Sequence, residues 1–283
     1  SWTGIVNGTQ SKPYNNFESV IDKLGQVTDL TVVIMDDWDV GSASTWTNRP
    51  PAPHNASIVG SINGNTLSGQ NTQTITLQGL TGSEVLTYTD SSTDPLYTLH
   101  FENFVDVTVE DLELVRTKNV PGMYPGTGGS TIQFYNVDGG SIKNCTLKAD
   151  GQNLGAAIFL FKSNNVTVEN CSIDVASQSD DGHLHAFYYR QSSDNLIKDC
   201  DINYLGSSEI GPPITFKNQS DNNLVENCVF TGNTTGSIFT GYHNLNANPV
   251  ELASINNRIA GCNSSAVIEE TVHTGSASPH IEY

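Results

Sequence analysis

Five segments of this chain carry a cysteine at the same place, at intervals of 26, 29, 28 and 34 residues. Before each cysteine, apolar and polar residues alternate over a short run, as in Val166-Thr-Val-Glu-Asn-Cys171. An earlier segment, Val107-Thr-Val-Glu-Asp-Leu112, fits the same frame with leucine in the cysteine position. A loose repeat of this length, carried by short alternating strands, is typical of a solenoid. The cysteines of the repeat are Cys145, Cys171, Cys200, Cys228 and Cys262.

Each repeat is predicted to contain two short strands that meet at a tight corner. In one of them, Val166 and Val168 face one way, and Cys171 and Ile173 resume an inward set after the corner at Asn170. Asn and Asp tolerate the left-handed backbone that such a corner requires, and stacked side-chain amides can hydrogen-bond to one another. The corner residues of successive repeats are Asn144, Asn170, Asp199 and Asn227.

A third strand completes each repeat, in segments 131–135, 158–162, 186–190 and 213–217. Three strands per turn, stacked about 4.8 Å apart, predict an all-β, single-domain parallel β-helix. The cysteines would then form a column of small buried residues in the core. We expect free thiols, because parallel side chains in a packed column have poor geometry for a disulfide.

The repeat suggests three parts: an N-terminal cap with the first strands in 1–54, the parallel β-helix in 55–265, and a C-terminal cap or tail in 266–283. Within the first part, residues 15–25 have the pattern of a short amphipathic helix, which would shield the open end of the solenoid. The chain starts at Ser1 without an initiator Met or signal peptide, so we expect a processed protein or a fragment.

The composition is strongly acidic, with a formal net charge of −18 and only 12 Lys and Arg residues. This balance argues against nucleic acid as a partner, because binding it requires many basic groups. No apolar run approaches the roughly 18 residues of a membrane span, so no membrane partner is expected. An extracellular, secreted or virion-surface protein, monomeric or homotrimeric, fits these properties.

The predicted helix, the strand Leu30–Met35 that follows it and the stacked turns together resemble the pectate-lyase-like superfamily of right-handed parallel β-helices. That superfamily includes polysaccharide lyases, polygalacturonase-type hydrolases and phage tailspike depolymerases. The resemblance covers most of the chain. It implies a right-handed β-helix and an acidic polysaccharide as partner.

A column of basic residues is the sharpest functional signal. When the third strands are aligned by their aromatic residues, one set of outward positions holds Tyr135, Lys162, Arg190 and Lys217. Like charges about 5 Å apart repel one another unless an anion lies over them. The column therefore predicts a site for a uronate or sulfated polysaccharide, although pairing with local acids such as Asp194 remains an alternative. Further expected substrate-binding residues on or beside these strands are Gln133, Thr215 and His183.

A second cluster, Asp180-Asp181-Gly-His183-Leu-His185, lies in the turn that enters the strand of Arg190. Two carboxylates and two imidazoles in one loop suit general acid–base catalysis or a divalent metal. We therefore consider a Ca²⁺ site at Asp180 and Asp181. The alternative is a solvated polar turn.

The resemblance narrows the choice of reaction. Asp180-Asp181 is similar to the Asp-Asp pair of polygalacturonases, but their Gly-His-Gly and Arg-Ile-Lys motifs are missing, which weakens a glycoside hydrolase. Chondroitinase-B-like and alginate lyases use a Lys base and an Arg acid on neighbouring turns, and Lys162 and Arg190 resemble that pair. A third reading is a non-enzymatic, tailspike-like module that binds glycan or has a structural role.

The lyase reading implies β-elimination on a uronate. Lys162 or Lys217 would act as the base, with its pKa lowered by a cationic neighbour. Arg190 would neutralise the carboxylate or serve as acid, and Tyr188 or His185 would donate the proton.

Overall fold

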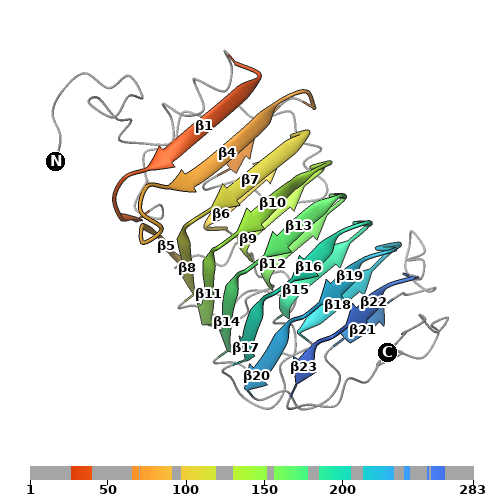
Figure 1. Ribbon diagram of the computed structural model, residues 1–283. Coiled ribbons are helices and arrows are strands. Elements are labelled where there is room, and N and C mark those ends of the chain that lie inside the picture. The colour runs from red at the N-terminus through yellow and green to blue at the C-terminus, as the bar shows by residue number, and fades with distance from the viewer. Residues whose placement is uncertain are drawn as a thin grey trace, which may run out of the picture.

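The computed structural model describes a stack of β-strands. The described residues are 27–39, 66–69, 71–90, 97–118, 130–151, 156–177, 185–204, 213–232, 239–242, 254 and 256–264. Every regular element in these ranges is a strand, and the strands form three sheets (Figure 1). The helix predicted for 15–25 and the tail after 265 lie outside the described residues.

The first sheet has eight strands, and it faces the viewer in Figure 1. They are β1 (Asp29–Ile34), β4 (Thr74–Gly79), β7 (Asp106–Glu110), β10 (Gly140–Lys143), β13 (Val166–Glu169), β16 (Leu196–Lys198), β19 (Leu224–Glu226) and β22 (Arg258–Ala260). The second sheet also has eight strands. They are β2 (Trp38–Asp39), β5 (Val85–Asp90), β8 (Glu113–Lys118), β11 (Thr146–Gly151), β14 (Ser172–Ser177), β17 (Asp201–Tyr204), β20 (Val229–Gly232) and β23 (Asn263–Ser264).

The third sheet has seven described strands. They are β3 (Thr66–Ser68), β6 (Leu99–Glu102), β9 (Ser130–Tyr135), β12 (Ala156–Phe161), β15 (His185–Arg190), β18 (Ile214–Lys217) and β21 (Phe239–Tyr242). Each coil takes one strand from each sheet, and each strand pairs in parallel with its counterpart in the next coil, as β10 does with β13. The predicted all-β parallel β-helix with three strands per turn is confirmed.

Inward-facing side chains stack into continuous columns that fill the coil. In the first sheet, Val109, Ile142 and Val168 occupy matching positions and are fully buried. The same column continues through Ile197 and Val225 to Ile259. Because each apolar residue lies between two others, the core has no single centre and each coil is stabilised mainly by its neighbours.

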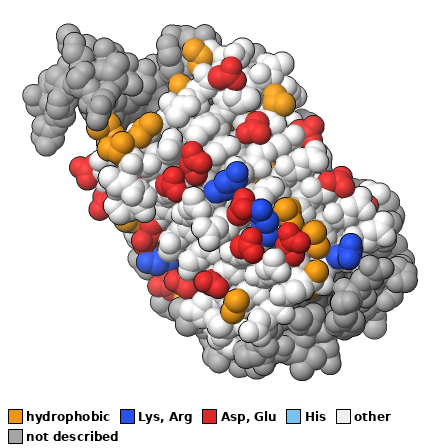
Figure 2. All heavy atoms as spheres, in the orientation of Figure 1, with side chains coloured by type: hydrophobic (Ala, Val, Ile, Leu, Met, Phe, Trp, Pro, Cys, Tyr) orange, Lys and Arg blue, Asp and Glu red, His pale blue; other side chains and the backbone are white. Residues whose placement is uncertain are grey.

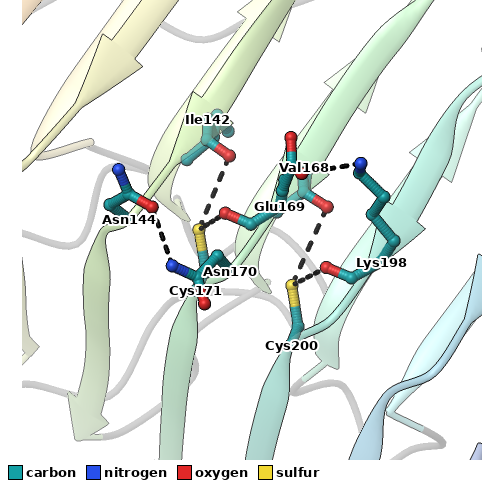
Figure 3. Close-up of polar contacts among 8 residues, drawn as sticks. All are labelled: Ile142, Asn144, Val168, Glu169, Asn170, Cys171, Lys198 and Cys200. Carbon is teal, nitrogen blue, oxygen red and sulfur yellow. Dashed lines mark hydrogen bonds and ion pairs between the residues drawn. The ribbon is translucent and has the colours of Figure 1, made fainter.

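The corners between the first and second sheets have the predicted left-handed backbone. Asn144, Asn170, Asp199 and Asn227 have φ between 51° and 54°. Their side chains also form hydrogen bonds from one coil to the next. For example, Asn170 Nδ2 donates to Asn144 Oδ1 at 2.8 Å. The predicted amide stacking is therefore confirmed for this pair (Figure 3).

The cysteines form the expected column of free thiols just after these corners. Cys171 Sγ donates to the carbonyl oxygens of Ile142 and Glu169, and Cys200 repeats this pattern one coil on (Figure 3). The side-chain contact with Cys145 raises the pKa of Cys171 to about 12, and burial acts in the same direction. The thiol form is therefore favoured in the folded protein.

We predict that the native protein has no more than one thiol that reacts quickly with a colorimetric disulfide reagent at mildly alkaline pH. Thiolate is the reactive species, and burial and a raised pKa both suppress it. Cys262 is the only half-exposed cysteine of the column, so it should react first, and all five should react in denaturant. Rapid modification of several thiols without denaturant would contradict the column.

Two further ladders lie inside the corner between the third and first sheets, and sequence reasoning missed them. In one, the hydroxyl of Ser192 accepts a hydrogen bond from the backbone of Ser163, and Ser220 does the same for Ser192. In the other, Asn195 Nδ2 donates to Asn223 Oδ1, and Asn223 Nδ2 donates to Asn257 Oδ1, each at 2.9 Å. The serine bonds, and further bonds from Asn195 to Ser163 O and from Asn195 N to Asn223 Oδ1, satisfy backbone groups that the corner removes from the sheets.

The outer face of the first sheet carries charges of alternating sign. Glu110, Lys143, Glu169, Lys198 and Glu226 occupy one outward column in that order. Lys198 Nζ lies 2.6 Å from Glu169 Oε1, and this bond lowers the pKa of Glu169. Figure 2 shows acidic and basic side chains side by side on this face. Opposite charges on adjacent strands favour the observed register.

Candidate functional site

The outer face of the third sheet holds most of the predicted site residues that are described. Alternation along β9 puts Ile132 and Phe134 in the core, so Gln133 and Tyr135 face outward. Pairing then defines two outward columns. The first contains His100, Gln133, Phe159, Tyr188 and Thr215. The second contains Glu102, Tyr135, Phe161, Arg190 and Lys217.

The predicted basic column is correct for two of its three cations. Arg190 pairs in register with Lys217, so these side chains leave adjacent strands on the same side. Lys162 was placed wrongly, because Phe161 takes the position beside Arg190 and β12 ends there. The strand Ala156–Phe161 is apolar on both faces. Aligning it by its aromatic residues therefore could not establish which of its positions face outward. Pairing instead points Leu160 into the core.

Lys162 nevertheless lies close to the same place. It is exposed at the corner after β12 and has φ 52°. Its Nζ is 5.5 Å from the centre of the Phe161 ring, and Arg190 Cζ is also 5.5 Å from that centre. The ring thus brings two cations together, and each gains a favourable interaction with it.

The proton-transfer candidates lie beside the cations on β15 and β18. His185 Nδ1 is 3.3 Å from Thr215 Oγ1, and the His185 ring stacks on Tyr188 with centroids 5.4 Å apart and an interplanar angle of 24°. Tyr188 is half-buried, whereas His185 and Thr215 are buried. Tyr188 and Arg190 are two residues apart on one strand, so both face outward about 7 Å apart along the strand.

The remaining predicted residues fall into two groups. Gln133 and Tyr135 lie on the outer face, on β9, three strands away from Lys217. Asp180, Asp181 and His183 lie outside the described residues. Within the described ranges, no group of three or more His, Cys, Asp or Glu side chains is arranged to hold a metal ion.

Sequence reasoning missed three charged or ionisable residues near this face. His100 and Glu102 occupy in β6 the places that Gln133 and Tyr135 hold in β9, so extending the repeat by one coil finds both. Arg116 is fully buried on the core side of β8. Burial raises the pKa of the nearby Tyr97 to about 12, and the charge of Arg116 opposes that shift. The sequence could have revealed the burial of Arg116, because the alternation Leu114-Val-Arg116 puts it in an inward-facing position.

The comparison with protein-family models identifies the family. Residues 60–262 match the model described as the right handed beta helix region. The chain belongs to the right-handed β-helix family. The match includes all the strands of this β-helix from β3 to β22. A search of curated protein sequences gives no match.

Solved structures similar to this right-handed β-helix come from several carbohydrate-active proteins. A candidate glycosyl hydrolase from Parabacteroides merdae has 12% identity and a TM-score of 0.45, covering 81% of this chain and 95% of its own. The pectin methylesterase of Aspergillus niger has 11% identity and a TM-score of 0.48, covering 98% and 93%. The A-module of the mannuronan C-5 epimerase of Azotobacter vinelandii has 12% identity and a TM-score of 0.27, covering 91% and 94%.

No helix in the described part of the chain has the length and apolar character needed to cross a bilayer.

Proposed function

We propose that this protein binds an acidic polysaccharide along the outer face of the third sheet and cleaves it by β-elimination. The observation that carries the proposal is that Arg190 and Lys162 both lie against Phe161, with Lys217 in register beside Arg190, in a chain of net charge −18. Cations on adjacent strands repel each other, and a carboxylate laid over them would relieve that repulsion. The proposal accords with the resemblance to the pectate-lyase-like superfamily.

In the proposed reaction, Arg190 and a neighbouring lysine neutralise the carboxylate of a uronate, which makes the proton at C5 more acidic. A base removes that proton, the electron pair forms the C4–C5 double bond, and the bond from C4 to O4 breaks. The departing O4 takes a proton from an acid. Lys217 is the preferred base because it lies in register with Arg190. Tyr188, with His185 stacked on it, is the preferred proton donor.

The test is a panel of alginate, polygalacturonate, hyaluronan, chondroitin and bacterial capsule polymers, each with calcium and with chelator. β-Elimination creates an unsaturated uronate that absorbs in the near ultraviolet, so the absorbance should rise on at least one polymer. Loss of the rise with chelator would indicate that Ca²⁺ neutralises the carboxylate. New reducing ends without absorbance would instead favour hydrolysis by Asp180 and Asp181. Glycan binding without either product would favour a non-enzymatic module, and both outcomes overturn the lyase.

The same proposal places the protein outside the cell or on a virion, where such polymers are met, as a monomer or homotrimer. Light scattering on the purified protein gives the oligomeric state.

The backbone at Lys162 gives a second test of its role. Left-handed backbone costs a residue other than Gly, Asn or Asp about 1–2 kcal/mol. The equivalent corner positions one and two coils earlier are Asn136 and Asn103, whose side chains bond to each other at 2.8 Å. We therefore predict that Lys162→Asn raises the free energy of unfolding by about 0.5–1 kcal/mol. The same substitution should lower the cleavage rate by about tenfold or more, because it removes a cation from the site.

Gln191→Asn is the matched control, since Gln191 occupies the same corner one coil later with φ 53°. It should stabilise the protein to a similar extent and leave cleavage unchanged. Thermal unfolding and initial rates measure both effects. If Lys162→Asn cleaves as fast as the parent, Lys162 has no part in the site.

A further inference from the structure

The outer face of the third sheet changes its charge along the stack of coils. Within its second outward column, the carboxylate of Glu102 lies toward one end, and the cations of Arg190 and Lys217 lie toward the other. Tyr135 and Phe161 lie between them. Glu102 and Arg190 are three strands apart, which is about 14 Å at the spacing of parallel strands. The column therefore has an acidic end, where Glu102 is only 4% exposed, and a basic end, where Arg190 and Lys217 are half-buried.

An uncharged aromatic belt separates the two ends. Tyr135 and Phe161 have ring centroids 5.2 Å apart, and Phe159 and Tyr188 have centroids 5.1 Å apart. Phe159 also stacks on Phe161 at 6.2 Å with an interplanar angle of 10°. Large rings of this kind bind the apolar C–H face of a pyranose better than they bind a carboxylate.

Gln133 adds a hydrogen-bonding requirement beside the belt. It lies in register between His100 and Phe159, and only 1% of it is exposed. Among the described residues, its Oε1 accepts no hydrogen bond. A buried acceptor without a donor is unfavourable, so a donor from a bound sugar would be favoured there. A hydroxyl or an acetamido N–H group is such a donor, and a carboxylate is not.

We infer that the substrate of this site alternates a uronate with an uncharged sugar that offers a hydroxyl or acetamido donor, as in a uronate–N-acetylhexosamine copolymer. This inference rests on the proposed function. The uronate lies over Arg190 and Lys217, and the uncharged sugar lies over the aromatic belt and Gln133. A sugar residue is about as long as the strand spacing of about 4.8 Å, so neighbouring sugars reach neighbouring coils. In a homopolymer of uronates, a second carboxylate would approach Glu102, and like charges brought together disfavour binding.

The experiment compares initial rates on two homopolyuronates, alginate and polygalacturonate, with those on two alternating polymers, hyaluronan and unsulfated chondroitin. The parent should cleave an alternating polymer at least about tenfold faster than either homopolyuronate. Glu102→Gln keeps the shape of the side chain and removes its charge, so it should raise kcat/KM on homopolyuronates by about tenfold. Gln133→Leu should raise KM on the alternating polymer. Glu110→Gln, which changes the same charge on the first sheet, is the control and should alter neither rate.

Cleavage of homopolyuronates as fast as alternating polymers, or no effect of Glu102→Gln on the ratio of the two, would overturn the inference while leaving the lyase intact. If no polymer is cleaved, the proposed reaction fails. Electrophoretic retardation in gels that contain each polymer then still tests the inference. Stronger retardation by the alternating polymers supports it, and equal or weaker retardation overturns it.

Discussion

Arg190→Ala is expected to lower kcat/KM on the cleaved polymer by about 10²–10³-fold, which is the usual cost of removing one group that stabilises charge in a transition state. Arg190 lies beside Lys217 in register and its guanidinium packs on Phe161, so it is the cation at the centre of the proposed site. Initial rates from near-ultraviolet absorbance measure the loss, and circular dichroism checks that the sheets are retained.

Two further variants sharpen that result. Arg190→Lys keeps the charge but loses the planar fork that binds a carboxylate through two hydrogen bonds, so it should recover only part of the activity. Arg258→Ala removes an exposed arginine from β22 of the first sheet and should leave the rate unchanged. Full activity in Arg190→Ala would remove this residue from the mechanism, and equal losses in both alanine variants would indicate a general effect of charge.

Asn223→Ala should have the largest effect on stability, lowering the free energy of unfolding by about 3–5 kcal/mol. Asn223 Oδ1 accepts hydrogen bonds from the backbone and side chain of Asn195, at 3.1 and 2.9 Å. Its Nδ2 donates to Asn257 and to the carbonyl of Ser192. Alanine leaves several of these buried groups without a partner, at about 1–3 kcal/mol each. The midpoint of thermal unfolding should fall by roughly 10 °C.

The neighbouring Asn222 provides the control for this prediction. It is exposed and has φ 57°. Its Nδ2 donates to Asp194 Oδ1 and its Oδ1 accepts from Asn256 Nδ2, each at 3.2 Å. Asn222→Gly retains the backbone conformation, so its cost should stay within about 1 kcal/mol. If both substitutions cost the same small amount, the buried asparagine ladder is not what holds these coils together.

The repeat was enough to predict the coils, because strand alternation and corner chemistry are local properties of the chain. Val168 and Cys171 were assigned to the core and Asn170 to a left-handed corner, and each assignment is confirmed. The buried ladder of Asn195 and Asn223 was not predicted. In a sequence, a buried asparagine next to a corner is indistinguishable from an exposed one until the partner in the next coil is known.

The site was less predictable than the fold, because the side-chain direction of a residue can be assigned only where its strand alternates clearly. Arg190 and Lys217 were paired correctly because their strands alternate clearly. Lys162 was assigned one position too early, inside the strand, because Ala156–Phe161 is apolar on both faces and a shift of one residue reverses every side chain. Asp180 and His183 lie outside the described residues, and their segment of the sequence does not follow the strand alternation that fixes the rest of the repeat.

Because the strands of the third sheet pair regularly, the distance between two residues on its outer face follows from the number of coils between them. Every coil inserted between Glu102 and Arg190 would add about 4.8 Å to their separation, and every coil removed would subtract the same amount. Because each coil presents equivalent ladders above and below, whole coils can be gained or lost without redesigning the core. Deleting the residues after Cys171 up to Cys200, for example, would bring Lys217 next to Phe161. A protein built this way can change the distance between two groups on its outer face by duplication or deletion of one repeat.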